Sequence, residues 1–284
     1  MTPVEPKDAA TVLLARDAPG GAQLFMVRRH KGNRFMANAH VFVGGRVDEA
    51  DADPATLARC TGLRPEEAAA RLGLEEGARA LAFYVAAVRE AFEEAGVLLA
   101  EDEPGYSRSA PLSLDELREQ LNAGSLAFGD FLARERLVIP ADRLRYLAHW
   151  ITPTFEPKRF SARFFICQVP ADQQARFDPR ETSAGEWLTV REILDGNREK
   201  RLQLAPPTLC ILEALLPSSA TAGALVAAAG DRPLPSVRPE PLMQSTALTL
   251  ILPEDRRYGG GAAEAGPEHY LVLEDGVWVR YRRD

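Results

Sequence analysis

Residues 81–97, LAFYVAAVREAFEEAGV, constrain the fold more than any other stretch, because they combine a helical apolar stripe with three clustered acids. Glu90, Glu93 and Glu94 occupy positions i, i+3 and i+4, which places their side chains next to one another on one side of a helix. Gly96 suits the position just after the last helical residue. The stretch therefore predicts one helix that ends at Gly96. Its core-facing stripe, at the 3.6-residue period, comprises Leu81, Tyr84, Val85, Val88, Phe92 and Ala95.

Three stacked carboxylates repel one another unless cations lie between them. A pair of acids on a helix is usually a solvated surface, but a hard dication such as Mg²⁺ or Mn²⁺ takes carboxylate and water ligands and can bridge to phosphate oxygens. Arg89 precedes Glu93 by four residues, so it can hold one acid by a charge-assisted hydrogen bond while the others bind metal.

The whole string R-E-A-F-E-E-A-G-V, from Arg89 to Val97, resembles the second half of the Nudix box, R-E-U-x-E-E-x-G-U, where U is aliphatic or small and apolar. The resemblance implies an α+β Nudix fold, with a mixed β-sheet sandwiched between helices. It also implies a Mg²⁺- or Mn²⁺-dependent hydrolase. The metal ligands would be Glu90, Glu93, Glu94 and the backbone near Gly45, and the catalytic residues would include Arg89, Glu93 and Glu94.

The first half of the box departs from the family pattern. The family places a glycine and a glutamate where this chain has Glu75 and Leu81. The segment HVFVGGRVD, residues 40–48, resembles the strand and Gly-Gly entry of Nudix proteins, with Val43 in place of a proline. The loop from Gly45 to the helix is then about thirty residues longer than usual, a length that tends to be functional. The early glutamate is not placed, and four acids are candidates for its role: Asp48, Glu49, Asp51 and Asp53.

The expanded box resembles that of the coenzyme A diphosphatase-like subgroup. Two later stretches resemble the same subgroup: W-I-T-P at residues 150–153 and R-F-S-A-R-F-F at residues 159–165. Arg159 and Arg163 are four residues apart on a predicted strand, so both would lie on one polar, substrate-facing side, with Phe160 and Phe164 on the core side.

Other candidate site residues lie at both ends of the Nudix region. Arg28 and Arg34 belong to a basic cluster before the Gly-Gly segment and are candidate contacts for substrate phosphate. Nudix enzymes commonly recruit a glutamate from outside the box, and Glu186 or Glu181 is the candidate for this catalytic role.

Composition limits the class of protein. The chain has 284 residues, 46% of them hydrophobic, which is ample for a packed core. The net charge of -7 argues against a general nucleic-acid or anionic-membrane binder. Three cysteines and no signal-peptide layout favour a reducing, cytoplasmic setting. We expect a cytoplasmic protein, with a small-molecule nucleotide as its partner, no nucleic acid or membrane, and a homodimer as an open possibility.

The remaining chain predicts a single Nudix domain over residues 1–284. Apolar runs at 9–16 and 22–29 predict a β-hairpin. Helical inserts are expected at about 49–77 and 105–140, with helices near 114–122 and 128–136. A strand that carries Trp187 should lead into a helix near Val190. The C-terminal extension, about 231–284, shows strand composition, with a hairpin turn at residues 274–276.

The expected reaction is hydrolysis of a nucleoside diphosphate linked to another group, X–P–P–Y. The resemblance favours coenzyme A or an acyl-CoA, cut to 3′,5′-ADP and a 4′-phosphopantetheine product. ADP-ribose, NADH and nucleotide sugars are alternatives within the same reaction class. A non-catalytic Nudix-fold binding or regulatory module is the alternative of another class. The intact Glu90, Glu93 and Glu94 oppose it, and the displaced early glutamate and Val43 favour it.

Overall fold

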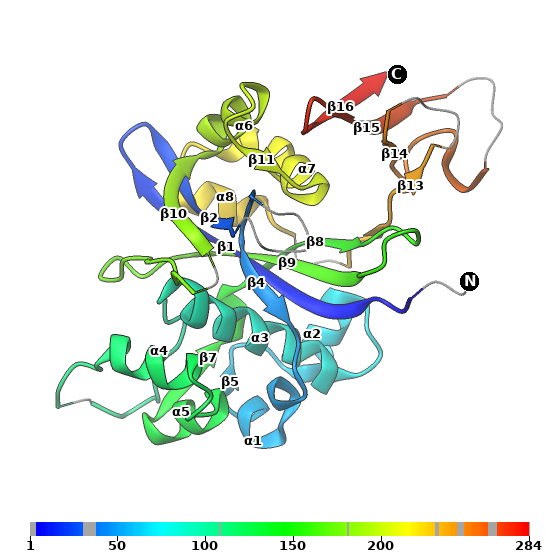
Figure 1. Ribbon diagram of the computed structural model, residues 1–284. Coiled ribbons are helices and arrows are strands. Elements are labelled where there is room, and N and C mark those ends of the chain that lie inside the picture. Colours follow the sequence, from blue (N-terminus) through cyan, green and yellow to red (C-terminus); the bar gives the residue numbers. More distant parts are fainter. Residues whose placement is uncertain are drawn as a thin grey trace.

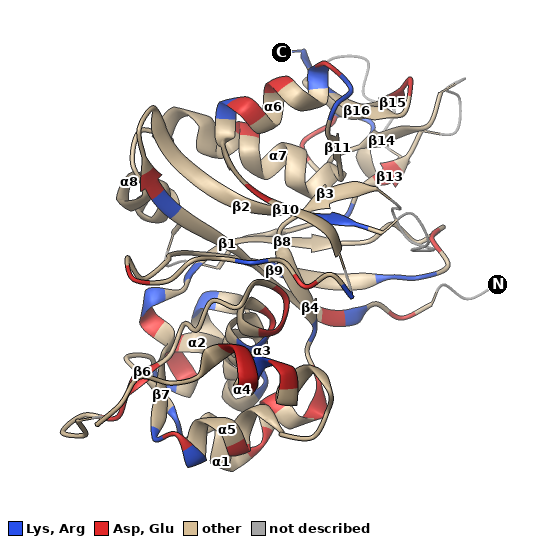
Figure 2. Cartoon of the chain, turned by 60° about the vertical axis from the view of Figure 1, so that its left-hand side comes forward, with Lys and Arg blue, Asp and Glu red and all other residues tan. Residues whose placement is uncertain are grey.

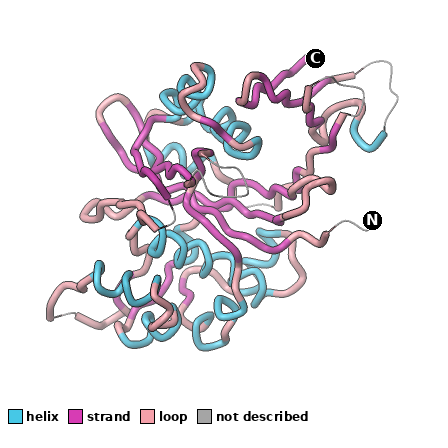
Figure 3. The backbone as a smooth tube through the Cα atoms, in the orientation of Figure 1, coloured by secondary structure: helices cyan, strands magenta, loops and turns pink. Residues whose placement is uncertain are grey.

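A mixed β-sheet lies between two layers of helices in the computed structural model (Figure 1). The structure describes residues 4–30, 38–107, 109–180, 182–230, 233–242, 247–260 and 266–283. Figure 3 shows the same arrangement by secondary structure, with strands through the middle and helices above and below. The predicted α+β fold with a sandwiched mixed sheet is therefore confirmed.

The first two strands form the predicted hairpin. β1 spans Lys7–Ala18 and β2 spans Gly21–Arg29, and they pair antiparallel. Gly20 and Gly21 have φ angles of 93° and 128° at the turn, a region that glycine enters without steric cost. Both strands bury long apolar runs because helices cover both faces of the sheet.

β1 changes its antiparallel partner along its length, and this opens the sheet. Residues 15–18 pair with β2, whereas residues 9–12 pair with β4. β2 pairs with β3 at Val27 and Arg28, beyond its pairing with β1, and it pairs with β10 from Gln23 to Arg29. The strand order is β11-β3-β2-β1-β9-β8-β12, with β4 on β1 and β10 on β2. The other strands are β3 Ala39–Val41, β4 Val43–Arg46, β8 Arg145–Ile151, β9 Phe160–Gln168, β10 Thr182–Thr189, β11 Gln203–Leu204 and β12 Ser236–Val237.

The lower helical layer is built around α3, Gly77–Ala95. The predicted stripe underestimates its burial, because every residue from Ala80 to Arg89 is buried. The inserts cover the side that would otherwise face solvent. Gly96 ends the helix with φ +65°, as predicted. The other elements of this layer are η1 Glu49–Ala52, α1 Pro54–Leu57, β5 Cys60–Thr61, α2 Pro65–Leu72, β6 Glu101–Asp102, α4 Leu114–Asn122, α5 Phe128–Arg134, β7 Leu137–Pro140 and η2 Ala141–Arg143.

Helices and a separate C-terminal sheet form the upper layer (Figure 1). The helices are α6 Val190–Arg198, α7 Pro206–Leu215 and α8 Ala222–Ala228, with η3 at Leu216–Ser218. The sheet comprises β13 Glu240–Pro241, β14 Thr249–Ile251, β15 Glu268–Glu274 and β16 Val277–Arg283, with η4 at Tyr258–Gly260.

The C-terminal sheet packs on the upper helices. Leu250 and Leu271 belong to the same buried cluster as Leu212 of α7. The turn predicted at residues 274–276 joins β15 to β16, and Glu274 pairs with Val277. The extent of the single domain, its inserts and its extension remains a prediction.

Charge is interspersed rather than segregated. Basic and acidic residues occur on both sides of the main sheet (Figure 2). Within the described residues, no helix is both long enough and apolar enough to cross a membrane.

His149 of β8 makes stability depend on pH. The pKa of His149 is lowered to about 4, mainly by burial and then by the positive charge of Arg163, while the negative charge of Asp8 opposes both. An unfolded histidine titrates near pH 6.5. Between about pH 6.5 and 4 the unfolded chain therefore holds a proton that the folded chain does not, so stability falls as the pH drops through this window.

The free energy of unfolding should fall less between pH 7 and pH 5 in His149→Gln than in the wild type, by about 1–2 kcal/mol. This value includes a discount because solvent partly screens the half-buried ring. Glutamine can keep the contact that Nε2 of His149 makes with Oγ of Ser161 at 2.8 Å. Urea unfolding at pH 7 and pH 5 measures the effect. Equal declines in the wild type and the variant would contradict it.

Candidate functional site

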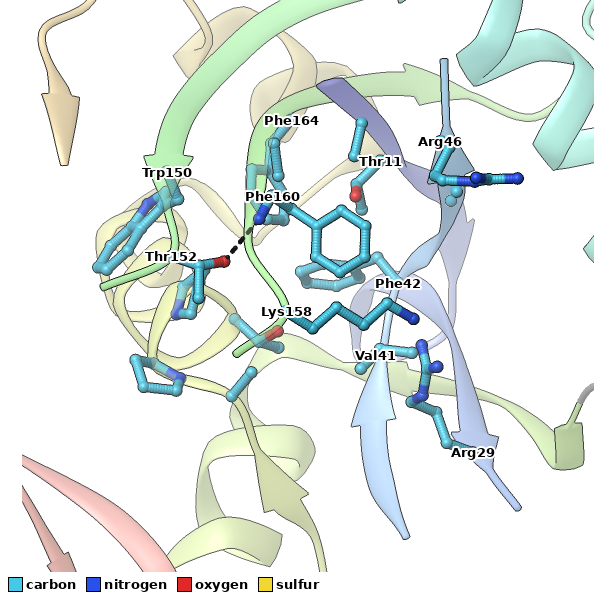
Figure 4. Close-up of a pocket in the computed structure, with 18 of the residues that line it drawn as sticks. Thr11, Arg29, Val41, Phe42, Arg46, Trp150, Thr152, Lys158, Phe160 and Phe164 are labelled. Carbon is cyan, nitrogen blue, oxygen red and sulfur yellow. Dashed lines mark hydrogen bonds between the residues drawn. The ribbon is translucent and has the colours of Figure 1, made fainter. Parts of the chain in front are cut away.

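A cavity of about 780 Å³ lies where the main sheet opens. Gly44 and Gly45 of β4 and the three acids of α3 line one part of it. Aromatic residues of β8 and β9 line another part (Figure 4). The cavity therefore joins a carboxylate region to an apolar region.

The two glycines allow β4 to approach the end of α3. The Gly44 N–H donates a hydrogen bond to Glu94 Oε2 at 3.0 Å. A Cβ at Gly45 would lie 2.3 Å from Glu90 Oε1, and one at Gly44 would lie 2.4 Å from the Ala10 carbonyl oxygen. Only glycine leaves this space, so the Gly-Gly entry places backbone directly against the helix acids.

Arg89 connects three acids of the site. Its Nη1 donates to Glu90 Oε1 at 2.8 Å and to Glu93 Oε2 at 2.9 Å. Its Nε and Nη2 donate to the two carboxylate oxygens of Asp51 at 2.8 and 2.9 Å, and Nη2 also donates to the Arg46 carbonyl oxygen. The predicted bond from Arg89 to Glu93 is present. Arg89 thus orients two of the helix acids from a buried position.

The charge of Arg89 is stabilised by these partners. Burial alone would lower the pKa of Arg89, but the hydrogen bonds that it donates to Asp51 and the negative charges of Glu90, Asp51 and Glu93 outweigh this effect. The net result is a pKa raised above the ordinary arginine value. Arg89 therefore stays protonated at every pH where the fold persists.

Four acids were candidates for the role of the early glutamate, and Asp51 is the one that accepts paired hydrogen bonds from Arg89. Asp51 is 1% exposed and also accepts the Asp48 N–H. The Asp48 side chain is 52% exposed and lies 3.8 Å from Nη2 of Arg89. Glu49 is exposed, and Asp53 caps α1 by accepting the Ala55 N–H. The insert thus supplies a buried partner for Arg89 from a sequence position that the family pattern does not mark.

The donors fit a hard dication in chemical type. Carboxylate oxygens of Glu90, Glu93 and Glu94 and the backbone of Gly45 border one cavity, and such oxygens are the ligands that Mg²⁺ and Mn²⁺ prefer. In the described part of the chain, no group of three or more His, Cys, Asp or Glu residues is arranged to hold a metal ion. The metal-ligand assignment therefore remains a prediction.

Arg28 and Arg34 were predicted to contact substrate phosphate, and the structure describes only Arg28. Arg28 donates to Ser183 Oγ at 2.9 Å and is not among the residues that line the cavity. Its neighbours Arg29 and His30 do line the cavity. Arg34 lies outside the described residues.

The side of β9 that was predicted to face the substrate is buried instead. Arg159 and Arg163 are 6% and 4% exposed, and the structure does not bring them to the cavity. Arg159 donates to the Thr152 carbonyl oxygen, and the guanidinium of Arg163 lies 4.4 Å from the ring centroid of Phe83 in α3.

Phe160 and Phe164 line the cavity, and Phe164 also belongs to a buried core cluster, in keeping with the predicted core side. The arginines of the other side are buried because the α2–α3 layer offers carbonyl and aromatic partners that a buried guanidinium can use. Alternation along a strand separates its two faces but does not reveal which of them borders a cavity.

Glu186 is not brought to the cavity either. It is exposed on β10, where it pairs with Met26 of β2, and it does not line the cavity. Glu181 lies outside the described residues. Among the described residues, the acids that line the cavity are Glu90, Glu93 and Glu94 of the box and Glu156 of the β8–β9 connection.

Several cavity residues were not predicted from sequence. The basic ones are Arg46, Lys158 and Arg180, beside Arg29 and His30 of the basic cluster that the sequence did indicate. Lys158 lies over the Phe160 ring, with Nζ 5.3 Å from its centroid (Figure 4). The apolar ones include Leu248 and Trp278, far from the box in sequence, and no local pattern connects them to it.

Comparison with known protein families gives a match that covers most of the chain. Residues 6–215 match the family described as the NUDT19 Nudix domain. Among solved structures, the crystal structure of a NUDIX hydrolase from Alicyclobacillus acidocaldarius is 28% identical, with a TM-score of 0.68. The match covers 81% of this chain and 99% of that one.

Curated relatives are similar over a smaller share of their own length. "Acyl-coenzyme A diphosphatase NUDT19" of Gallus gallus is 28% identical over 71% of this chain and 65% of the relative. The Homo sapiens protein of the same description is 27% identical over 66% of this chain and 58% of the relative. The match thus spans less than two thirds of the length of these relatives.

Proposed function

Because the chain belongs to the family described as the NUDT19 Nudix domain, we propose that it is a Nudix diphosphatase that cuts X–P–P–Y into two monophosphates. Membership confirms the Nudix resemblance found in the box. The observation that carries the proposal is that Glu90, Glu93 and Glu94 all border one cavity large enough for a nucleotide-sized ligand.

The proposed substrate is coenzyme A or an acyl-CoA. The two products are 3′,5′-ADP and 4′-phosphopantetheine, and the latter carries the acyl group when the substrate is an acyl-CoA. The descriptions of the curated relatives support this choice. The cavity supports it as well, because an acyl-CoA combines a charged diphosphate with an apolar chain, and the cavity combines a carboxylate region with an apolar one.

Mg²⁺ or Mn²⁺ is the proposed cofactor, with Glu90, Glu93, Glu94 and the Gly45 backbone as the residues that would hold it. When bound, such an ion offsets the charge of the diphosphate and lowers the pKa of a water molecule. Arg89 keeps Glu90 and Glu93 oriented through the hydrogen bonds described above. A disordered pair of carboxylates would lose this preorganisation.

The remaining steps fall to residues of this chain at the cavity. Arg29, Arg46 and Lys158 supply positive charge for phosphate oxygens. A carboxylate of the box accepts the proton of the attacking water, since these acids lie beside Gly44 and Gly45 at the cavity and Glu186 does not line it. The water oxygen bonds to one phosphorus, the P–O–P bridge breaks, and the bridging oxygen leaves with the other phosphate.

The test is a substrate screen of the purified chain with Mg²⁺ or Mn²⁺. We expect release of 3′,5′-ADP from coenzyme A and acyl-CoA, measured by chromatography, with kcat/KM at least about tenfold above that for ADP-ribose, NADH and nucleotide sugars. Chelation with EDTA should abolish the release. Preference for ADP-ribose, NADH or a nucleotide sugar would overturn the substrate assignment.

Binding without turnover would instead identify a non-catalytic Nudix-fold module. Isothermal titration with 3′,5′-ADP, alongside the turnover assay, separates the two classes. Tight binding together with no phosphate-bond cleavage in either metal would overturn the enzymatic proposal.

A further inference from the structure

The apolar region of the cavity is completed by the C-terminal sheet. Leu248 precedes β14, Leu250 lies within it, and Trp278 lies in β16, and all three line the cavity. These residues lie outside residues 6–215, the part that matches the family. One wall of the cavity therefore comes from a segment that the family match does not include.

Exposed apolar side chains gather at this cavity. Among the described residues, three large hydrophobic side chains are exposed: Val4 at 52%, Phe155 at 47% and Leu248 at 44%. Phe155 and Leu248 both line the cavity, although they come from the β8–β9 connection and the C-terminal sheet, respectively. Apolar surface left in contact with solvent at a cavity indicates a ligand with an apolar part.

The cavity differs in character from one side to the other. Figure 4 shows Arg46 and Trp150 at opposite sides of it, with Phe160 and Lys158 between them. The side of Arg46 continues to β4 and the box acids, whereas Trp150 belongs to the same buried cluster as Leu250. The distribution matches a ligand with a charged middle and an apolar end.

We propose that the C-terminal sheet binds the acyl chain of the substrate and thereby sets which acyl-CoA lengths are hydrolysed best. This inference rests on the proposed function and adds the residues that determine specificity. The chosen occupant is an acyl chain, because the wall is aliphatic as well as aromatic at Leu248, Leu250 and Trp278. An adenine base would instead require hydrogen-bond partners for its edge.

The test measures kcat/KM for coenzyme A and for acetyl-, hexanoyl-, dodecanoyl- and palmitoyl-CoA. The wild type should prefer a medium or long chain over unacylated coenzyme A. Leu248→Glu should reduce the ratio of kcat/KM between the preferred acyl-CoA and coenzyme A by about tenfold or more, because it places a charge where the chain packs. Phe155→Glu, in the β8–β9 connection, should reduce the same ratio.

Val4→Glu is the matched control, because Val4 is the third exposed large hydrophobic side chain and does not line the cavity. It should keep the wild-type ratio, which excludes a general effect of added charge. Thermal unfolding confirms that each variant is folded. Leu248 is partly exposed, so its replacement should not remove core packing.

Three results would overturn the inference in distinguishable ways. A wild type that hydrolyses coenzyme A and every acyl-CoA equally would show that no acyl site exists, with the proposed function intact. An unchanged ratio in folded Leu248→Glu would exclude this wall. Absence of cleavage of any coenzyme A substrate would remove the proposed function, and the inference with it.

Discussion

Glu94→Gln lowers kcat on the proposed coenzyme A substrate by about 100- to 1,000-fold, with the fold retained. Glutamine keeps an oxygen that can accept the Gly44 N–H, so the contact between β4 and α3 survives. The variant removes only a negative charge, which is the property that a dication site requires. Steady-state kinetics across a Mg²⁺ titration measure the loss.

Glu119→Gln provides the control for this variant. Glu119 is an exposed glutamate of α4 and does not line the cavity, so its replacement should leave kcat within about twofold of wild type. If folded Glu94→Gln kept full metal-dependent turnover, the metal-ligand role of the box acids would be excluded.

Asp51→Asn destabilises the protein by about 3–5 kcal/mol, because it leaves the buried guanidinium of Arg89 without its main carboxylate partner. Activity should fall as well, since Arg89 also orients Glu90 and Glu93. Urea unfolding at neutral pH gives the change in the free energy of unfolding. Double-mutant coupling of Asp51→Asn with Arg89→Met should exceed about 1 kcal/mol.

Asp48→Asn is the matched comparison, because Asp48 approaches the same arginine from an exposed position. An exposed ion pair at this separation contributes less than about 1 kcal/mol, so this variant should unfold close to wild type. Equal free energies of unfolding for the Asp48 and Asp51 variants would show that burial does not increase the contribution of the Asp51–Arg89 ion pair to stability.

Local patterns predicted most elements because the cues lie within short windows. The hairpin of β1 and β2, the helix start at Val190 and the end of α3 at Gly96 each depend on neighbouring residues. The polar side of β9 was predicted wrongly, because alternation places Arg163 and Phe164 on opposite sides without showing that helices bury both of them. Arg163 lies against α3, and Phe164 borders the cavity.

The candidate site was predictable only in its helical part. Spacing within one helix places Glu90, Glu93 and Glu94 together, because neighbours at i, i+3 and i+4 share a side whatever the rest of the fold does. Glu186 lies far from the box in sequence and was assigned a catalytic role by resemblance to the family. The register of β10 on β2 leaves it exposed and outside the cavity.

By itself, the amino-acid sequence determined the acid-bearing helix, its glycine end and the family, since each depends on short-range spacing or on a contiguous motif. Only the tertiary structure decided that Asp51 partners Arg89 and that Leu248 and Trp278 border the same cavity as the box acids. These contacts join residues separated by tens to nearly two hundred positions. Their meeting depends on how the inserts and the C-terminal sheet pack against the core, which no local pattern encodes.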